Sequence, residues 1–216
     1  MAARQNILQR IRGANRRGGE PTPEERETVL ARLREHPRGP LPTVPGELKA
    51  RFGERCIALQ STLDAVEELG RAPQAIARYL RDHQLPLSGV CWPQFAALDW
   101  RAAGLTVEAR TCGAEDKVGI TGAYCAIAET GTLMLLSGEH EHAATSLLPD
   151  THVALVPVAR IVRTMEDAWD LLRAERGSLP RQVNFVSGPS RTADIEMTLV
   201  MGAHGPFRVH IVLIGS

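Results

Sequence analysis

The strongest constraint on the fold comes from two short apolar runs, at residues 133–136 and 153–158, that lack the polar alternation of a half-exposed strand. Continuous apolar runs are typical of strands that are covered on both faces of a parallel sheet. Residues 164–174, which follow the second run, have the apolar spacing of a helix. Strands that alternate with helices in this way predict an α/β domain.

The same two kinds of pattern occur throughout the chain from residue 46 onward. An amphipathic stretch begins there, and residues 72–84 carry Ile76, Tyr79 and Leu80 at helical spacing. Segments that indicate strands lie at residues 87–91, 105–109, 183–186 and 207–214. We therefore expect one α/β domain with a mostly parallel sheet over residues 46–216.

Residues 1–45 have a different character and predict a helical N-terminal arm followed by a linker. A short helix with apolar side chains on one face is expected first. A second helix is predicted over residues 23–35, because Thr22 is a suitable N-cap and Pro23 suits the first helical position. Residues 36–45 contain four prolines and a glycine, a composition that favours a linker.

The chain is neutral as a whole, since 25 Lys and Arg balance 25 Asp and Glu. The balance is uneven, because residues 1–19 carry five arginines and no acid, which leaves the remainder with an equal negative excess. Neutrality argues against a polyanion-binding surface, so we expect no nucleic-acid partner. No window is apolar enough for membrane insertion or for a signal peptide. A basic arm beside an acidic remainder leaves a homo-oligomer as one open arrangement.

The four cysteines stand singly, at positions 56, 91, 112 and 125, and form no C-x-x-C pair. This pattern suits a reducing compartment and supplies no zinc or iron–sulfur ligand set, so we expect a cytoplasmic chain without a metal or cofactor of its own. Residues 139–142 alternate Glu and His, but their spacing matches no named metal site. A solvent-exposed loop is the simpler interpretation.

A first candidate site consists of Glu129, Thr130, Gly131 and Thr132, directly before the apolar run at residues 133–136. Glu129 could serve as a catalytic base or nucleophile. Gly131 permits a positive φ or a close backbone approach, and the two threonine hydroxyls can hold a ligand oxygen. Alternatively, Glu129 pairs with an arginine or caps a turn.

A second candidate site follows the predicted strand at residues 183–186. A turn and then a helix start are expected there, with exposed N–H groups, hydroxyls and one guanidinium able to hold a carboxylate or phosphate. In open α/β sheets, ligands bind beyond the carboxyl ends of strands. The alternative is a capped turn with a structural ion pair between Arg191 and Asp194. The candidate ligand-binding residues are Gly188, Ser190, Arg191, Thr192 and Asp194.

A third candidate site is the tight turn that contains His204 and Gly205, just before the last predicted strand. The imidazole of His204 could act as an acid, a base or a ligand, although a turn histidine often serves only in hydrogen bonding. If Glu129, Arg191 and His204 converge, one pocket would combine a carboxylate, an oxyanion clamp and a titratable group. Such a pocket would suit a small acid.

Four segments together resemble the lactate-utilization (LUD) domain family, and the resemblance extends over roughly residues 45–216. They are Ala-Glu-Thr-Gly-Thr at 128–132, Ser-Leu-Leu-Pro and Thr-His-Val within 146–153, and the segments 187–196 and 202–206. Each is short, but all four occur in the order found in the family.

The resemblance implies a three-layer α/β/α fold like that of the sugar-phosphate isomerase and CoA-transferase superfamily. It also implies a cytoplasmic role in oxidising L-lactate to pyruvate, alongside partner proteins that carry iron–sulfur clusters. An alternative is a stand-alone enzyme of the CoA-transferase or isomerase type that binds a small anionic or phosphorylated ligand. In that case Glu129 would be the nucleophile or base, by analogy with some CoA transferases. A ligand-binding regulator is the third hypothesis.

Overall fold

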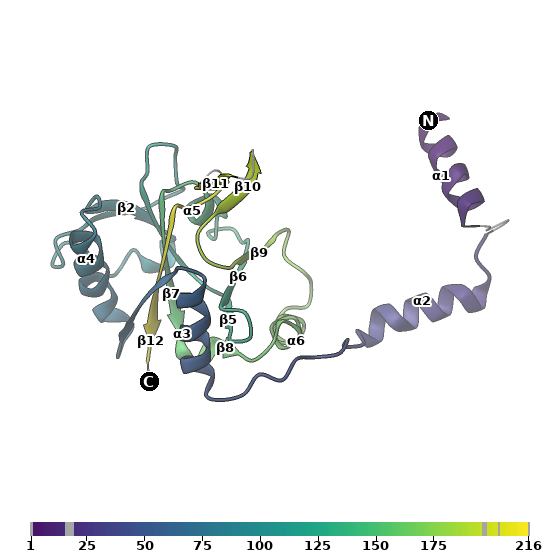
Figure 1. The fold of residues 1–216 in the computed structure, drawn as a ribbon, viewed down its shortest axis with the longest axis horizontal. Helices are drawn as coiled ribbons and strands as arrows, with labels where there is room; N and C mark the ends of the chain where they lie inside the picture. The colour runs from purple at the N-terminus through teal and green to yellow at the C-terminus, as the bar shows by residue number, and fades with distance from the viewer. Residues whose placement is uncertain (1, 16–19, 196–197, 203, 216) are drawn as a thin grey trace. The chain divides into compact units, whose positions relative to one another are not determined.

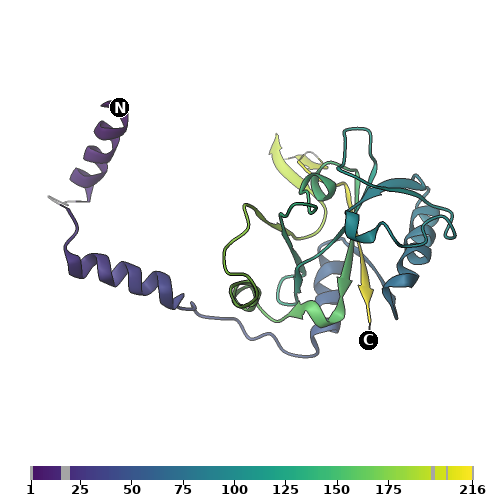
Figure 2. The same ribbon diagram turned by 180° about the vertical axis from the view of Figure 1, so that it is seen from behind.

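The computed structural model describes residues 2–15, 20–195, 198–202 and 204–215. The chain forms two compact units, Met1–Leu41 and Pro42–Ser216. Figures 1 and 2 show helices alone in the first unit and both helices and sheets in the second. Over the described residues, none of the helices has the length and apolar character needed to cross a membrane.

The first unit contains α1 (Ala2–Ala14) and α2 (Pro23–Glu35). Helix α2 has the predicted bounds, because Thr22 and Glu25 form a reciprocal cap at its start. The N–H of Glu25 donates to Thr22 Oγ1 at 3.1 Å, and the N–H of Thr22 donates to the Glu25 carboxylate at 2.8 Å. The apolar side chains of α2, such as Val29 and Leu33, are exposed.

A six-stranded, entirely parallel sheet forms the centre of the second unit, in the order β1-β12-β7-β4-β2-β3. Its strands are β1 (Thr62–Val66), β2 (Ser88–Cys91), β3 (Thr106–Ala109), β4 (Val118–Gly122), β7 (Thr151–Pro157) and β12 (Arg208–Ile214). Helices α3 (Leu48–Ala58) and α4 (Ala72–Asp82) flank the sheet, as Figure 1 shows. The predicted α/β class with a parallel sheet is confirmed.

A second sheet of four strands lies beside the first, in the order β8-β5-β6-β9. It consists of β5 (Cys125–Ile127), β6 (Thr132–Leu136), β8 (Ile161–Val162) and β9 (Val183–Val186). Strand β6 runs antiparallel to both of its neighbours, so the expectation that residues 133–136 belong to a parallel sheet is wrong. The run is apolar because Leu133 and Leu135 face the main core, whereas Met134 and Leu136 face α6 (Met165–Glu175).

Helix α6 begins where the sequence predicts, since Thr164 and Asp167 form a second reciprocal cap. Strand β1 is missing from the sequence prediction, because Asp64 interrupts its apolar pattern. The remaining short elements are α5 (Ala144–Leu147), η1 (Leu69–Arg71), η2 (Pro93–Phe95), η3 (Val158–Arg160), β10 (Arg191–Ile195) and β11 (Thr198–Met201).

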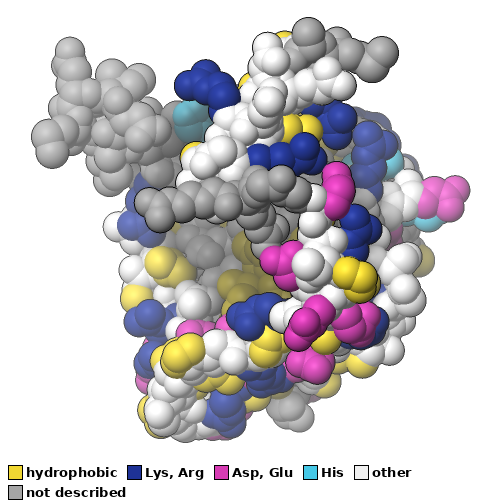
Figure 3. Space-filling view, turned by 90° about the vertical axis from the view of Figure 1, so that its right-hand side faces the viewer, with side chains coloured by type: hydrophobic (Ala, Val, Ile, Leu, Met, Phe, Trp, Pro, Cys, Tyr) yellow, Lys and Arg dark blue, Asp and Glu magenta, His cyan; other side chains and the backbone are white. Residues whose placement is uncertain are grey.

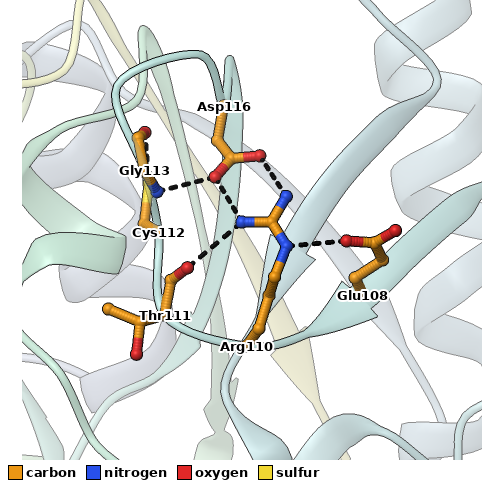
Figure 4. A network of polar contacts seen from close by, with 6 residues as sticks. All are labelled: Glu108, Arg110, Thr111, Cys112, Gly113 and Asp116. Carbon is orange, nitrogen blue, oxygen red and sulfur yellow. Dashed lines mark hydrogen bonds and ion pairs between the residues drawn. The ribbon is translucent and has the colours of Figure 1, made fainter.

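A salt-bridge network fixes the connection from β3 back across β2 to β4 (Figure 4). Parallel crossovers usually need about a dozen residues or more, and residues 110–117 make this one. The Arg110 guanidinium donates to both carboxylate oxygens of Asp116, at 2.7 and 2.8 Å, and to Glu108 at 2.6 Å. These bonds lower the pKa of Asp116, whose carboxylate also accepts the N–H of Gly113. The network therefore stabilises the order of β4, β2 and β3.

Candidate functional site

The chain reverses its course across the sheet between the neighbouring strands β2 and β4. From β2 the chain passes outward to β3, whereas from β4 the later strands β7 and β12 are added in the opposite direction. In open α/β sheets, ligands bind outside the carboxyl ends of the strands at such a reversal. The residues after Cys91 and Gly122 therefore occupy the favoured position for a site.

A cavity of about 160 Å³ lies at this reversal, and we call it the switch-point cavity. It gathers residues from the ends of β2, β4 and β6, from the following loop and from the end of α6. The lining residues are Trp92, Gln94, Gly122, Ala123, Tyr124, Leu136, Ser137, Gly138, Glu141 and Arg176.

Three polar side chains of the cavity, Gln94, Glu141 and Arg176, have no hydrogen bond or ion pair with another described residue. The side chains of Gln94 and Glu141 lie against two glycines, which have no side chain to fill the same space. A Cβ at Gly122 would lie 3.0 Å from Nε2 of Gln94, and a Cβ at Gly138 would lie 2.0 Å from Oε2 of Glu141. The cavity therefore presents an amide, a carboxylate and a guanidinium that are available to a ligand.

A cluster around Glu175 holds the last turn of α6 beside the cavity. Arg160 donates to both carboxylate oxygens of Glu175, at 2.6 and 2.9 Å, and the Tyr124 hydroxyl donates to the same carboxylate at 2.7 Å. The Arg160 guanidinium also lies 4.6 Å from the centroid of the Tyr124 ring. Hydrogen bonds from Arg160 and then Tyr124 lower the pKa of Glu175 to about 2. The cluster thereby fixes the position of the next residue, Arg176.

The loop at residues 139–142 is exposed, as the sequence predicts, except that Glu141 is half-buried and lines the cavity. The indole N–H of Trp92 donates to the backbone oxygen of His142 at 3.2 Å and holds the loop at this end of the sheet. Within the described part of the chain, no group of three or more His, Cys, Asp or Glu side chains is placed to hold a metal ion.

The first motif predicted from the sequence is the turn between β5 and β6, against helix α3. Oε2 of Glu129 accepts the backbone N–H of Met165 at 3.4 Å, at the start of α6, and the Arg55 guanidinium donates to the Glu129 backbone oxygen at 3.2 Å. These contacts correspond to the capping alternative for Glu129. Its role as a base or nucleophile stays a prediction.

The other residues of this turn make contacts inside the protein. Thr130 donates to the hydroxyl of Thr132, which is 2.7 Å from the hydroxyl of Ser187. Gly131 has a φ of +70°, and a Cβ there would lie 2.8 Å from Cβ of Arg55 and 2.9 Å from the backbone of Arg55 and Cys56. Only glycine therefore fits without a shift of α3.

The second motif, which is the second candidate site of the sequence analysis, contacts the end of α3. The prediction that a helix begins there is wrong. Residues Arg191–Ile195 form strand β10, which pairs with β11 in an antiparallel hairpin. A Cβ at Gly188, where φ is +81°, would lie 2.5 Å from the Leu59 backbone oxygen, and Arg191 Nη2 donates to that oxygen at 2.7 Å. The helix-end anion site therefore does not form. The side chains of Thr192 and Asp194 lie outside the described residues.

The third motif contacts the second at Ser190. The backbone N–H of His204 donates to Ser190 Oγ at 3.4 Å, a Cβ at Gly205 would lie 3.4 Å from Cβ of Ser190, and the imidazole of His204 is exposed. Together, residues 129–132, 187–191 and 204–205 form what we call the motif strip. The structure brings the three segments into contact, but Glu129 and Arg191 engage different helices.

The switch-point cavity was missed because, of its lining residues, only Glu141 lies in a segment that the sequence analysis considered as a possible binding site, and that segment was interpreted as a solvent-exposed loop. One indication was present: Trp92 and Gln94 follow the predicted strand at residues 87–91 directly, at the position where α/β sheets bind ligands. The other half of the site depends on β4, which the sequence analysis does not predict.

Comparison with known proteins identifies relatives over most of the chain. Lactate utilization protein C of Bacillus subtilis (strain 168) is 41% identical over 102 residues, which are 46% of this chain and 42% of that protein. Lactate utilization protein C of Shouchella clausii (strain KSM-K16) is 32% identical over 184 residues, 78% of this chain and 79% of that protein. The aligned part of this chain thus spans less than half the length of the Bacillus subtilis protein.

Among solved structures, a DUF162 family protein from Deinococcus radiodurans shares the fold, with a TM-score of 0.59 and 22% sequence identity. That match covers 81% of this chain and 100% of the other. The LUD domain family model matches residues 94–214, more than half of the chain. The chain therefore belongs to the LUD domain family.

Proposed function

We propose that this protein is a component of a cytoplasmic L-lactate utilization system, in which it acts with iron–sulfur proteins that oxidise L-lactate to pyruvate. The observation that carries the proposal is the alignment with lactate utilization protein C of Shouchella clausii over 78% of this chain. The family membership agrees with it, and the model of that family covers the whole motif strip and every lining residue of the switch-point cavity except Trp92.

The chemistry of the cysteines supports placing the electron-transfer clusters in partner proteins. Burial raises the pKa of the Cys56 thiol to about 12 and that of the Cys91 and Cys125 thiols to about 11. Metal ligation requires the thiolate, so these separated side chains are poor cluster ligands.

The charge of one face of the molecule agrees with a small-molecule role rather than a nucleic-acid partner. On the face shown in Figure 3, acidic and basic side chains of the described residues lie among one another. A mixed surface of this kind gives no extended positive field for a polyanion.

The alternative, a stand-alone CoA-transferase or isomerase with Glu129 as nucleophile or base, has less support. The Glu129 carboxylate already accepts an N–H at the start of α6, and the cavity with available polar groups does not include it.

Deletion of the gene in the organism that encodes it tests the proposed function. Growth on L-lactate as the carbon source should be lost, whereas growth on pyruvate should continue. A plasmid copy of the gene should restore growth on L-lactate. Extracts of the deletion strain should also lose L-lactate-dependent dye reduction. Unchanged growth and dye reduction would overturn the proposal.

Isolation of the tagged full chain from cells grown on L-lactate tests the partner assignment. Proteins that contain iron and acid-labile sulfide should be recovered with it. Recovery of the chain without any iron-containing protein would contradict this part of the proposal.

A further inference from the structure

The size of the switch-point cavity limits its ligand to a small molecule. Its volume is about 160 Å³, well above the roughly 10–15 Å³ that holds one water molecule by the same measure. Sites for drug-sized ligands and cofactors usually measure about 300–1,000 Å³. A ligand of a few non-hydrogen atoms therefore fits within the cavity.

The charge of Arg176 favours a carboxylate as one end of this ligand. A guanidinium presents paired N–H groups that match the two oxygens of a carboxylate. The Arg176 side chain has no ion pair with another described residue, and the adjacent Glu175 is held by Arg160 and Tyr124. The exposed guanidinium, whose charge also acts on Glu175, therefore keeps its N–H groups available to a ligand.

Glu141 favours a hydrogen-bond donor as the second polar group of the ligand. An ionised carboxylate only accepts hydrogen bonds, so a ligand hydroxyl beside it would be stabilised and a ligand carbonyl oxygen would be repelled. Ser137 Oγ accepts the N–H of Gln182 at 2.9 Å, which leaves its own proton free for the ligand. The apolar lining residues Trp92, Ala123 and Leu136 suit a short hydrocarbon group.

We propose that the switch-point cavity binds a short 2-hydroxycarboxylate, with Arg176 holding the carboxylate and Glu141 accepting the hydrogen bond of the hydroxyl. The ligand class follows from the cavity. The choice of L-lactate as its member rests on the proposed function. The cavity should discriminate against the corresponding 2-oxo acid, pyruvate.

Titration of the ¹⁵N-labelled full chain with L-lactate and with pyruvate, followed by NMR at the indole N–H of Trp92, tests the proposal. Trp92→Phe identifies the resonance. L-lactate should shift it saturably and bind more tightly than pyruvate. Arg176→Gln should weaken L-lactate binding roughly 10- to 100-fold, because a hydrogen bond to a charged group is lost. Glu141→Gln should reduce the preference for L-lactate, because an amide can donate to a carbonyl.

Arg173→Gln is the matched control, since Arg173 lies in the last turn of α6, just before Arg176, but pairs with Asp170 at the surface. It should bind L-lactate like the wild type. Arg176→Lys, which keeps the charge but loses the fork, should give an intermediate affinity and provides a second test if Arg176→Gln unfolds. The proposal is overturned by a wild-type chain that shows no saturable shift, or by equal affinities of the Arg176 and Arg173 variants.

The two proposals fail in different ways. A chain that does not bind L-lactate, but whose deletion still abolishes growth on L-lactate, would refute the ligand assignment and leave the proposed function intact. Binding that depends on Arg176 in a chain whose deletion has no effect on lactate growth would refute the proposed function instead.

Discussion

The motif strip and the switch-point cavity use their polar side chains in opposite ways. In the motif strip, Glu129 accepts an N–H at the start of α6, Thr132 contacts Ser187, and Arg191 donates to the end of α3. In the switch-point cavity, Gln94 and Arg176 have no such partner among the described residues.

If the switch-point cavity binds the ligand as proposed, the recognisable motifs and the binding site do not coincide in this fold. Buried polar groups are nearly always hydrogen-bonded, and a group that is bonded within the protein contributes to the fold. Gln94 and Arg176 are exposed side chains that line the cavity without such a partner in the described part of the chain, so they can hydrogen-bond to a ligand in place of water. The contacts of the motif strip join the second sheet to α3, and the cavity is the place that we propose for a small molecule.

Replacement of Gly131 should produce the largest loss of stability and test the structural role of the motif strip. Gly131→Ala combines a positive φ with a Cβ less than 3 Å from α3, and should cost about 4 kcal/mol in the free energy of unfolding. Gly46→Ala is the control, because its φ is +87° but no atom lies within 4 Å of the added Cβ. It should cost about 1–2 kcal/mol. Equal losses in urea unfolding would remove the packing argument.

Replacement of Arg160 should change ligand binding in the switch-point cavity and the pH dependence of the free energy of unfolding. The pKa of Glu175 is lowered from 4.5 to about 2 in the folded chain. The unfolded state therefore binds more protons between these values, so the stabilisation is complete above pH 4.5 and is lost as the pH falls toward 2. The difference in unfolding free energy between wild type and Arg160→Gln should be largest at neutral pH and shrink in acid.

The same Arg160→Gln variant should bind L-lactate more weakly, because the turn that carries Arg176 loses its anchor. Urea midpoints at neutral and acidic pH, together with the NMR titration, measure both effects. A stability difference that is independent of pH, with unchanged binding, would show that the cluster around Glu175 does not position the cavity.

Replacement of Arg191 should have a smaller effect, on stability alone. Arg191→Gln removes a charged donor from the Leu59 oxygen at the end of α3, which should cost about 1 kcal/mol. The variant gene should still restore growth of the deletion strain on L-lactate. Lost growth with unchanged stability would mean that the motif strip takes part in function directly.

Replacement of Glu129 should have the smallest effect of all. In Glu129→Gln, the amide oxygen can still accept the N–H of Met165, so the unfolding free energy should change by less than about 0.5 kcal/mol. Growth on L-lactate should also be retained. If Glu129 were a nucleophile, the same substitution would abolish activity, so complementation of the deletion strain distinguishes the two roles.

The elements predicted correctly are those whose evidence lies within a few residues. Helices α2 and α6 begin directly after their N-caps, Thr22 and Thr164, because a cap requires only the side chain and the next turn. The prediction of a helix after Ser190 used the same rule and was wrong, because pairing with β11 decides the conformation of residues 191–195. Local cap residues cannot report a distant partner strand.

The sequence by itself determined the α/β class, the capped helices and the fully covered character of β6, because each depends on local spacing and burial. The tertiary structure alone decided that β6 joins a separate sheet with antiparallel neighbours, that Glu129 and Arg191 contact α6 and α3, and that a cavity lies at the carboxyl ends of β2 and β4. These features depend on contacts between residues far apart in the chain, which set the neighbours of a strand and the partners of a polar group.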